Sequence, residues 1–390
     1  MRLIAAVVLI LTVCFQAQAL QVIEKDYPPV NGVQIFVLSQ EYARDYDKFF
    51  RELKAKNVDT VFFRVFHNSS DRVHTFADNP CTPMGGGVYF NSKVACTVSN
   101  MLPEIVEAGK RNGVLVYAWM ATRSLSFLKT QDKMSLSFTP NGYTSGYGAN
   151  IFNRDVRDAI KRLMMEIADT GVDGILIQDD FIMKFSEGAD LLSCGRFTAD
   201  TGIACTAENL FDIRYNDDGS RRFGNATANG ERWYQWKAEQ LQDLFKEMKD
   251  ATRIINPNMK WALNIYYETP VYPHQGLAWY AQDMKGIWEA GADYVAVMTY
   301  QDQIMREKQL DRSGFLQFIS DLSRASLRSS LVDKSRVIFK VQATEFGSGN
   351  PVQTESLELL CNRLRREGSQ SIVQLPIYSA GDIIPVCGFQ

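Results

Sequence analysis

Short apolar runs alternate with longer amphipathic segments along most of the chain. The runs have the length and β-branched content of buried strands, and the segments between them have a helical period. Eight strands are expected, at Val33–Ser39, Val58–Phe66, Gly113–Met120, Val172–Asp179, Met259–Tyr266, Tyr294–Tyr300, Arg336–Thr344 and Ser371–Ser379. Seven helices are expected, at Glu41–Lys56, Leu102–Asn112, Arg154–Thr170, Gly230–Ile255, Ala278–Ala290, Gly314–Val332 and Thr354–Glu367.

This alternation predicts an α/β fold whose parallel strands are joined by right-handed crossovers. Eight repeats predict a closed (β/α)8 TIM-like barrel. Gly113, Gly171 and Gly291 stand where helices are expected to end, which agrees with the pattern. Because no Pro/Gly/Ser-rich linker interrupts the chain, residues 20–390 are expected to form a single domain.

Two long segments break the regular alternation: Asn68 to about Thr97, and Phe181 to about Asn229. Both follow predicted strands, so they are expected as long loops at the C-terminal face of the barrel, where barrel enzymes build their active sites. Long insertions on that face usually shape a groove for an extended substrate.

The first residues have the pattern of an export signal. Arg2 precedes the apolar run Leu3–Phe15, and Ala17-Gln18-Ala19 forms a small-x-small cleavage site. We expect residues 1–19 to be a signal peptide, the mature chain to begin at Leu20, and the protein to be periplasmic or secreted. The run is too short for a membrane anchor, and no later segment is long and apolar enough to span a bilayer.

Removal of this signal would also remove Cys14 and leave six cysteines. An even number in an oxidising compartment predicts disulfides, and 15 pairings of six cysteines are possible. Pairing of sequence neighbours is the simplest arrangement: Cys81 with Cys96, Cys194 with Cys205, and Cys361 with Cys387. A zinc site is the competing interpretation, but the chain has no Cys-x-x-Cys and only three histidines, so neither a metal nor a cofactor is expected.

The charge of the chain limits its partners. A net charge of −3 with scattered Lys and Arg gives no broad basic surface, so nucleic acid is not expected as a partner.

The fourth predicted strand ends on two acids, Asp179 and Asp180. In a parallel barrel this position faces the active-site mouth. One aspartate could instead cap a turn while the other forms a salt bridge. Adjacent carboxylates raise each other's pKa, however, which acid/base catalysis can use.

Other strand ends supply possible partners for these acids. Carboxylates together with aromatic rings suit a sugar polymer, because rings stack on pyranose faces while acids act at the glycosidic bond. Asp302 is a further candidate catalytic acid. The candidate substrate-binding residues are Arg64, His67, Asp71, Trp119, Gln178, Asn264, Tyr266, Glu268, Trp279 and Tyr300.

Five segments in order carry a family resemblance: VYAWM at 116–120, DGILIQDD at 173–180, NIYYETPVYP at 264–273, WYAQ at 279–282 and DYVAVMTYQD at 293–302. Together they resemble the C-terminal glycoside-hydrolase domain of PgaB-type poly-β-1,6-N-acetylglucosamine deacetylases, over roughly residues 30–380.

The resemblance implies a barrel that cleaves partly deacetylated poly-β-1,6-N-acetylglucosamine, a biofilm polysaccharide, with a possible role beside exopolysaccharide export machinery. The family's essential acid falls in the pair Asp179 and Asp180, and its acid at the end of the sixth strand falls on Asp302. Tyr266, Trp279 and Gln282 match further family signatures. No deacetylase activity is expected, because the chain has no room for that domain.

Three positions depart from the family pattern. Gln178 replaces a His, Phe181 replaces a small residue, and Asp302 is shorter than the usual Glu. The resulting hypothesis is endo-acting glycoside hydrolysis, with Asp179 or Asp180 protonating the leaving oxygen and the other, or Asp302, assisting. A non-catalytic carbohydrate-binding barrel and a hydrolase of another exopolysaccharide are the alternatives.

Overall fold

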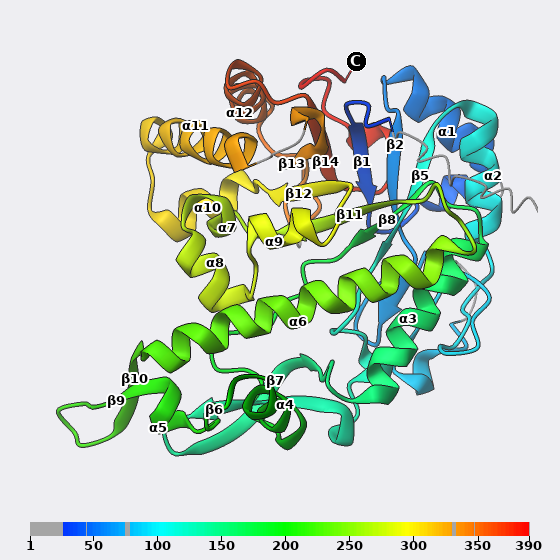
Figure 1. Ribbon diagram of the computed structural model, residues 1–390. Helices are drawn as coiled ribbons and strands as arrows, with labels where there is room; N and C mark the ends of the chain where they lie inside the picture. The colour runs from blue at the N-terminus through cyan, green and yellow to red at the C-terminus, as the bar shows by residue number, and fades with distance from the viewer. Residues whose placement is uncertain (1–25, 44, 75–78, 330–332, 347, 390) are drawn as a thin grey trace, which may run out of the picture.

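The computed structural model describes residues 26–390 except 44, 75–78, 330–332, 347 and 390, so the predicted signal peptide lies outside the described residues. Eight strands close into a barrel in which every neighbouring pair is parallel (Figure 1). In chain order they are β1 (Asn31–Ile35), β2 (Thr60–Arg64), β5 (Leu115–Met120), β8 (Gly174–Ile177), β11 (Lys260–Ile265), β12 (Tyr294–Met298), β13 (Val337–Gln342) and β14 (Ser371–Ile377). All eight predicted strands are confirmed.

The helices that follow these strands form the outer layer. They are α1 (Tyr46–Ala55), α2 (Leu102–Asn112), α3 (Arg154–Asp169), α6 (Ala228–Arg253), α8 (Pro273–Tyr280), α9 (Met284–Glu289), α11 (Arg312–Ser329) and α12 (Thr354–Arg366). Gly113, Gly171 and Gly291 adopt the positive φ angles of helix stops, as predicted.

One predicted helix, Ala278–Ala290, is wrong because the segment forms two helices. Ala281 has φ +53°, which ends α8, and the side chain of Asp283 then caps α9. Between them the buried side chain of Gln282 accepts a hydrogen bond from the backbone N–H of Tyr266 at 3.1 Å and donates to the carbonyl of Asn264 at 3.1 Å. The break between α8 and α9 therefore lets Gln282 bind the backbone at the end of β11. The helix expected from Glu41 also begins later, at Tyr46.

Three aspartates close the amino-terminal end of the barrel. Asp59, Asp173 and Asp293 each stand directly before a strand and accept a hydrogen bond from a backbone N–H of the neighbouring strand, at Asn31 (3.0 Å), Val116 (2.8 Å) and Trp261 (2.9 Å). These carboxylates satisfy backbone donors that the barrel ladder leaves open.

The insertions after the strands gather at the other end of the barrel. They are β3 (Phe66–Asn68), β4 (Gly86–Val88), β6 (Met134–Thr139), β7 (Gly142–Ala149), α4 (Leu191–Thr201), α5 (Ala207–Leu210), β9 (Phe211–Tyr215), β10 (Arg221–Ala226), α7 (Glu268–Val271) and α10 (Gln301–Lys308). Among the described residues, short 3-10 helices lie at Gln40–Tyr42, Thr82–Met84, Ser126–Leu128, Gln131–Lys133, Lys334–Arg336 and Ala380–Asp382.

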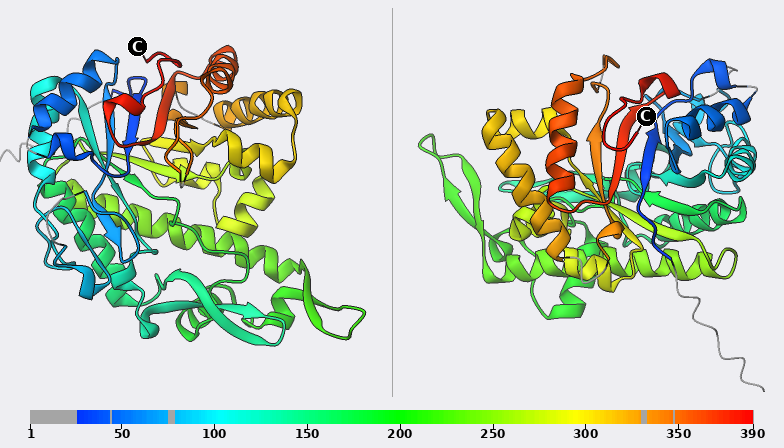
Figure 2. Two further views of the ribbon diagram at one scale, coloured as in Figure 1. Left: turned by 180° about the vertical axis from the view of Figure 1, so that it is seen from behind. Right: turned by 90° about the horizontal axis from the view of Figure 1, so that it is seen from above.

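The insertion after β5, which carries the β6–β7 hairpin, is a third long loop beyond the two predicted ones. It lies with α4, α5 and the β9–β10 hairpin below α6 in Figure 1, and Figure 2 shows the β9–β10 hairpin projecting from the body. This region has a second hydrophobic core that includes Phe138, Phe197, Phe211, Trp233 and Trp236. The insertions are therefore packed structures and not loose loops.

The three predicted disulfides are confirmed. Cys81–Cys96 lies in the loop after β2, Cys194–Cys205 in the loop after β8, and Cys361–Cys387 joins α12 to the C-terminal segment, with Cα–Cα distances of 5.6, 5.3 and 5.1 Å. Because these thiols are paired, the zinc interpretation is wrong for them. Among the described residues, no helix has the length and apolar content needed to cross a bilayer.

Candidate active site

The two acids after β8 have different surroundings. Asp180 is fully buried and accepts four hydrogen bonds from the loop after β5: from the backbone N–H and hydroxyl of Thr122 (2.8 and 3.2 Å) and from those of Ser124 (2.7 and 2.9 Å). Its carboxylate is thus occupied by the protein, and it holds the loop after β5 against the end of β8.

Asp179 is partly exposed, and its carboxylate has a hydrogen bond from the side chain of Gln178. Burial raises the pKa of Asp179; the positive charge of Lys340 opposes this effect and the carboxylate of Asp180 adds to it. A carboxyl group with a raised pKa keeps its proton to higher pH than an ordinary aspartate, which suits a general acid.

Three phenols surround Asp179. Tyr147 comes from β7, Tyr266 follows β11, and Tyr300 precedes α10, and all three are partly exposed. Burial raises the pKa of each phenol, and the Asp179 carboxylate raises it further. They therefore stay neutral hydrogen-bond donors over the working range of most enzymes.

Aromatic rings extend the site on two sides. Trp119, at the end of β5, packs on Phe36 with ring centroids 4.6 Å apart, and Phe346 continues this wall to Tyr300 at 5.2 Å. Beyond Asp179, Tyr266 stacks on Tyr280 at 3.9 Å. Trp279, which precedes Tyr280 in α8, packs on Phe185 with ring centroids 5.2 Å apart. Its ring is 54% exposed, which makes it available to stack on a sugar.

Three predicted substrate-binding residues have contacts within the loop after β2: Arg64, His67 and Asp71. Arg64 is buried, donates to the backbone carbonyl of Arg72 and lies 3.9 Å from the Asp71 carboxylate. His67 is also buried and hydrogen-bonds Asn79 at 2.9 Å, and burial lowers its pKa. These residues hold the loop after β2, and none of their described contacts joins them to Asp179.

Asn264 and Glu268 lie nearer the phenols. Asn264 is buried and accepts a hydrogen bond from the ammonium of Lys340 at 3.0 Å. Glu268 begins α7, and its carboxylate accepts a hydrogen bond from the hydroxyl of Tyr280 at 3.4 Å. Burial raises the pKa of Glu268, so it is a second carboxyl close to the aromatic side of the site.

Asp302 lies in the first turn of α10 with its side chain exposed. Burial and the carboxylate of Glu345 raise its pKa, and Arg306 lowers it. The charges acting on Asp302 are thus different from those acting on Asp179, and the predicted catalytic role of Asp302 stays a prediction.

The sequence prediction does not include Lys340 or Tyr147. Lys340 interrupts the apolar run of β13, and a lysine in a buried strand is the signal that could have indicated it. Tyr147 lies in the third insertion, whose alternating small and polar residues give little strand signal.

A buried ionic network supports this end of the barrel. Arg123 and Glu187 form a fully buried ion pair, and Glu187 also accepts from the backbone N–H of Gly148 at 3.2 Å and of Lys184 at 2.9 Å. The buried ammonium of Lys237, on α6, donates to the carbonyls of Lys184 (2.6 Å) and Phe185 (3.0 Å). The network joins the loops after β5 and β8 to α6.

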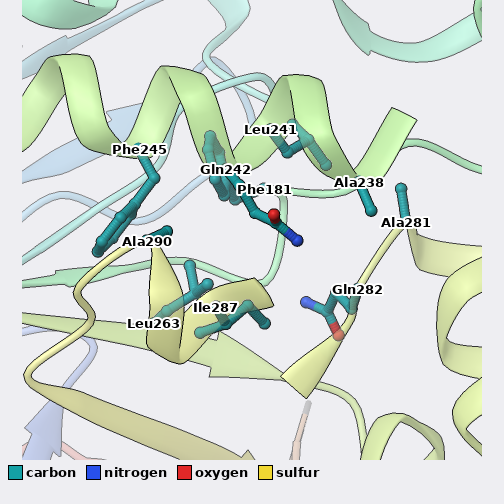
Figure 3. Close-up of a pocket in the computed structure, with 10 residues that line it drawn as sticks. All are labelled: Phe181, Ala238, Leu241, Gln242, Phe245, Leu263, Ala281, Gln282, Ile287 and Ala290. Atoms are coloured by element: carbon teal, nitrogen blue, oxygen red, sulfur yellow. The ribbon is translucent and has the colours of Figure 1, made fainter. Parts of the chain in front are cut away.

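A small apolar pocket between α6, α9 and β11 is a different feature (Figure 3). Its volume of about 10 Å³ is room for about one water, which is far too little for a sugar. Phe181 points into this pocket beside Leu241 and Gln242. The family departure at Phe181 therefore fills space behind β8, away from the barrel mouth.

Comparisons with known proteins agree with this geometry at the level of fold. The glycoside-hydrolase domain of PgaB (BpsB) from Bordetella bronchiseptica superposes with a TM-score of 0.70 and 20% identity, covering 90% of this chain and 94% of that chain. A β-galactosidase from Marinomonas ef1 gives 0.59 and 10% identity over 88% of this chain and 53% of that chain. The β-amylase catalytic domain from Paenibacillus polymyxa gives 0.52 and 10% identity over 93% and 95%.

A comparison with curated protein sequences finds no match. The predicted likeness to the PgaB-type domain is confirmed in the fold, and glycosidases share the architecture. Residues 41–374 match the family described as hypothetical glycosyl hydrolase family 13, which supports glycosidase activity. The chain belongs to hypothetical glycosyl hydrolase family 13.

Proposed function

We propose that this protein is an exported endo-acting glycoside hydrolase of an amino-sugar exopolysaccharide, with Asp179 as the acid that protonates the leaving oxygen. The observation that carries the proposal is the environment of Asp179: a partly exposed carboxyl with a raised pKa at the carboxyl end of a barrel strand, among neutral phenols. Three disulfides fit the oxidising compartment that export implies.

Partly deacetylated poly-β-1,6-N-acetylglucosamine is the proposed substrate. The ordered sequence motifs and the fold shared with the PgaB glycoside-hydrolase domain support it. The exposed rings of Trp279 and Phe346 suit stacking against pyranose rings, and Phe36 packs between Phe346 and the buried Trp119.

In this mechanism Asp179 gives its proton to the glycosidic oxygen as the bond to the anomeric carbon breaks. A water molecule adds to that carbon and gives up a proton, with Asp302 as the proposed base. The hydroxyl of Tyr266 donates to the backbone carbonyl of Asp179 at 3.5 Å and can accept a hydrogen bond from a sugar hydroxyl, whereas the neutral phenol of Tyr300 donates a hydrogen bond to a sugar oxygen. Asp180 acts indirectly, because its four hydrogen bonds keep the adjacent loop, and therefore Trp119, in place.

The test is product analysis with the mature protein, residues 20–390, on a panel of exopolysaccharides, with mass spectrometry of the products. Shortened oligosaccharides from the partly deacetylated polymer are expected from the wild type and not from Asp179→Asn. Retention of polymer without shortened products would instead support a carbohydrate-binding barrel. Cleavage of a different polymer would reassign the substrate, and intact hydrolysis in Asp179→Asn would refute the catalytic assignment of Asp179.

A further inference from the structure

Lys340 is a buried lysine within the barrel. It lies on β13, and its side chain is only 2% exposed. Its ammonium donates to Asn264 on β11 at 3.0 Å and lies 5.7 Å from the centre of the Tyr300 ring, which follows β12. The side chain therefore points across the barrel interior, toward the mouth that Asp179 borders.

The ammonium of Lys340 has few partners for a buried charge. It carries three N–H donors, and the Asn264 oxygen is the one acceptor that it has among the described residues. It makes no direct ion pair with any carboxylate in that part of the chain, although burying a charge without one is costly. Two donors are thus available toward the site.

The groups that face Lys340 and Asp179 come from four elements. Asp180 follows β8, Tyr147 is on β7, Tyr266 follows β11 and Tyr300 precedes α10. Burial raises the pKa of the three phenols, so they remain neutral. Asp180 is held by four hydrogen bonds, which leaves Lys340 as the positive charge that acts on Asp179.

We propose that Lys340 is a positioning residue whose charge sets the pH range in which Asp179 carries its proton. The inference rests on the proposed function in one respect, namely that Asp179 is the catalytic acid. It assigns a role to a residue outside the recognised motifs, and it identifies the pair Asp179 and Lys340 as the unit that titrates in the site.

The sign of the effect follows from the charges. Burial lowers the pKa of Lys340 to about 7, so its charge is present below neutral pH and fades above it. While charged, Lys340 stabilises ionised Asp179 and lowers the pKa of that carboxyl, against the effect of burial. Removing the charge should therefore keep Asp179 protonated to higher pH.

The experiment measures kcat/KM against pH for the wild type, Lys340→Met and Lys340→Arg. In Lys340→Met the fall of kcat/KM at alkaline pH (the alkaline limb of the profile) should move up by about one pH unit. An opposite charge nearby shifts the pKa of a carboxyl by roughly that much or more. In Lys340→Arg the guanidinium stays charged throughout, so the limb should stay in place or move down. If Lys340 had a purely structural role, both variants would lose activity, but their alkaline limbs would lie at the same pH.

Lys237→Met is the matched control. Lys237 is also fully buried, and burial lowers its pKa to about 7, but its charge partners are Glu187 and Arg123. This variant should lose stability while its alkaline limb stays at the wild-type pH. If Lys340→Met does not fold, Lys340→Gln, which can still donate to Asn264, replaces it with the same expectation.

A second readout does not depend on activity. The Asp179 carboxyl carbon, assigned by its loss in Asp179→Asn, can be titrated by carbon NMR in each variant. A higher midpoint in Lys340→Met than in Lys340→Arg would support the inference even if no polymer were cleaved, in which case only the proposed function fails. Equal midpoints and coincident limbs in active enzymes would overturn the role of Lys340.

Discussion

At the amino-terminal end of the barrel, Asp59, Asp173 and Asp293 each accept a hydrogen bond from a strand N–H, whereas at the carboxyl end Asp179 accepts none from the neighbouring strands. Burial raises the pKa of Asp59, Asp173 and Asp179 alike. A shifted pKa therefore does not separate a structural acid from a catalytic one. The difference lies in whether a backbone N–H of a neighbouring strand donates to the carboxylate.

The largest expected effect is at the carboxyl end. Asp179→Asn should lower kcat/KM by about 10²- to 10⁴-fold, the usual contribution of a general acid, because the amide has no proton to give. The unfolding temperature should stay near that of the wild type, since among the described residues no N–H of a neighbouring strand donates to Asp179 and the amide oxygen of Asn can still accept a hydrogen bond. Calorimetry beside product analysis checks both parts, and a large fall in unfolding temperature would show that Asp179 belongs with the structural acids.

The opposite result is expected at the amino-terminal end. Asp173→Ala leaves the N–H of Val116 without its acceptor, which should cost about 1–3 kcal/mol in the free energy of unfolding. Activity per folded molecule should be unchanged. Denaturant titration with active-site counting measures this, and a specific loss of kcat would remove the distinction between the two ends.

The free energy of unfolding should depend on pH because of the buried lysines near the carboxyl end of the barrel. Because burial lowers the pKa of Lys237 to about 7 in the folded state, the unfolded chain binds more protons between that pH and the ordinary lysine range. Stability should therefore rise with pH above about 7, by up to about 1.4 kcal/mol per pH unit from this group. Comparing unfolding free energies at pH 7 and 9 in the wild type and Lys237→Met tests it; equal slopes would contradict it.

The smallest expected effect belongs to an exposed ring at the carboxyl end. Trp279→Ala should raise KM for the polymer about two- to tenfold, which corresponds to the loss of one stacking contact. Its unfolding temperature should change little, because the ring is 54% exposed. Binding isotherms with defined oligosaccharides measure the change, and undiminished binding would place the substrate elsewhere on this face.

The barrel could be predicted from the sequence because the pattern of each strand is local and the pattern repeats along the chain. Each strand is an apolar run between a helix and a turn, and all eight were recognisable in that form. The helix break at Ala281 could not be recognised in this way. It depends on a hydrogen bond between Gln282 and the end of β11, 16 residues earlier, and hydrophobic periodicity does not show such a contact.

The site could be predicted only in part for the same reason. The predicted strand ends agree with the positions of Asp179, Asp180, Tyr266 and Tyr300, while the roles of these residues stay predictions. Which aspartate is available depends on Thr122 and Ser124, in an insertion that carries no recognisable pattern. Arg64 and His67 also end or follow a strand, but the loop after β2 covers them. The position of a residue in its strand indicates whether its side chain lies near the mouth, and the packing of the loops determines whether that side chain is exposed.

The segment 122–124 has a further consequence for variation among related chains. Its backbone binds Asp180, while the side chain of Arg123 reaches the opposite way, to Glu187 and to the carbonyl of Ala149 at the end of β7. Both ends of the β6–β7 insertion are therefore anchored, whereas its tip near Asn141 and Tyr143 is exposed. Changes in length and composition at this exposed tip should therefore leave the acid after β8 in its position.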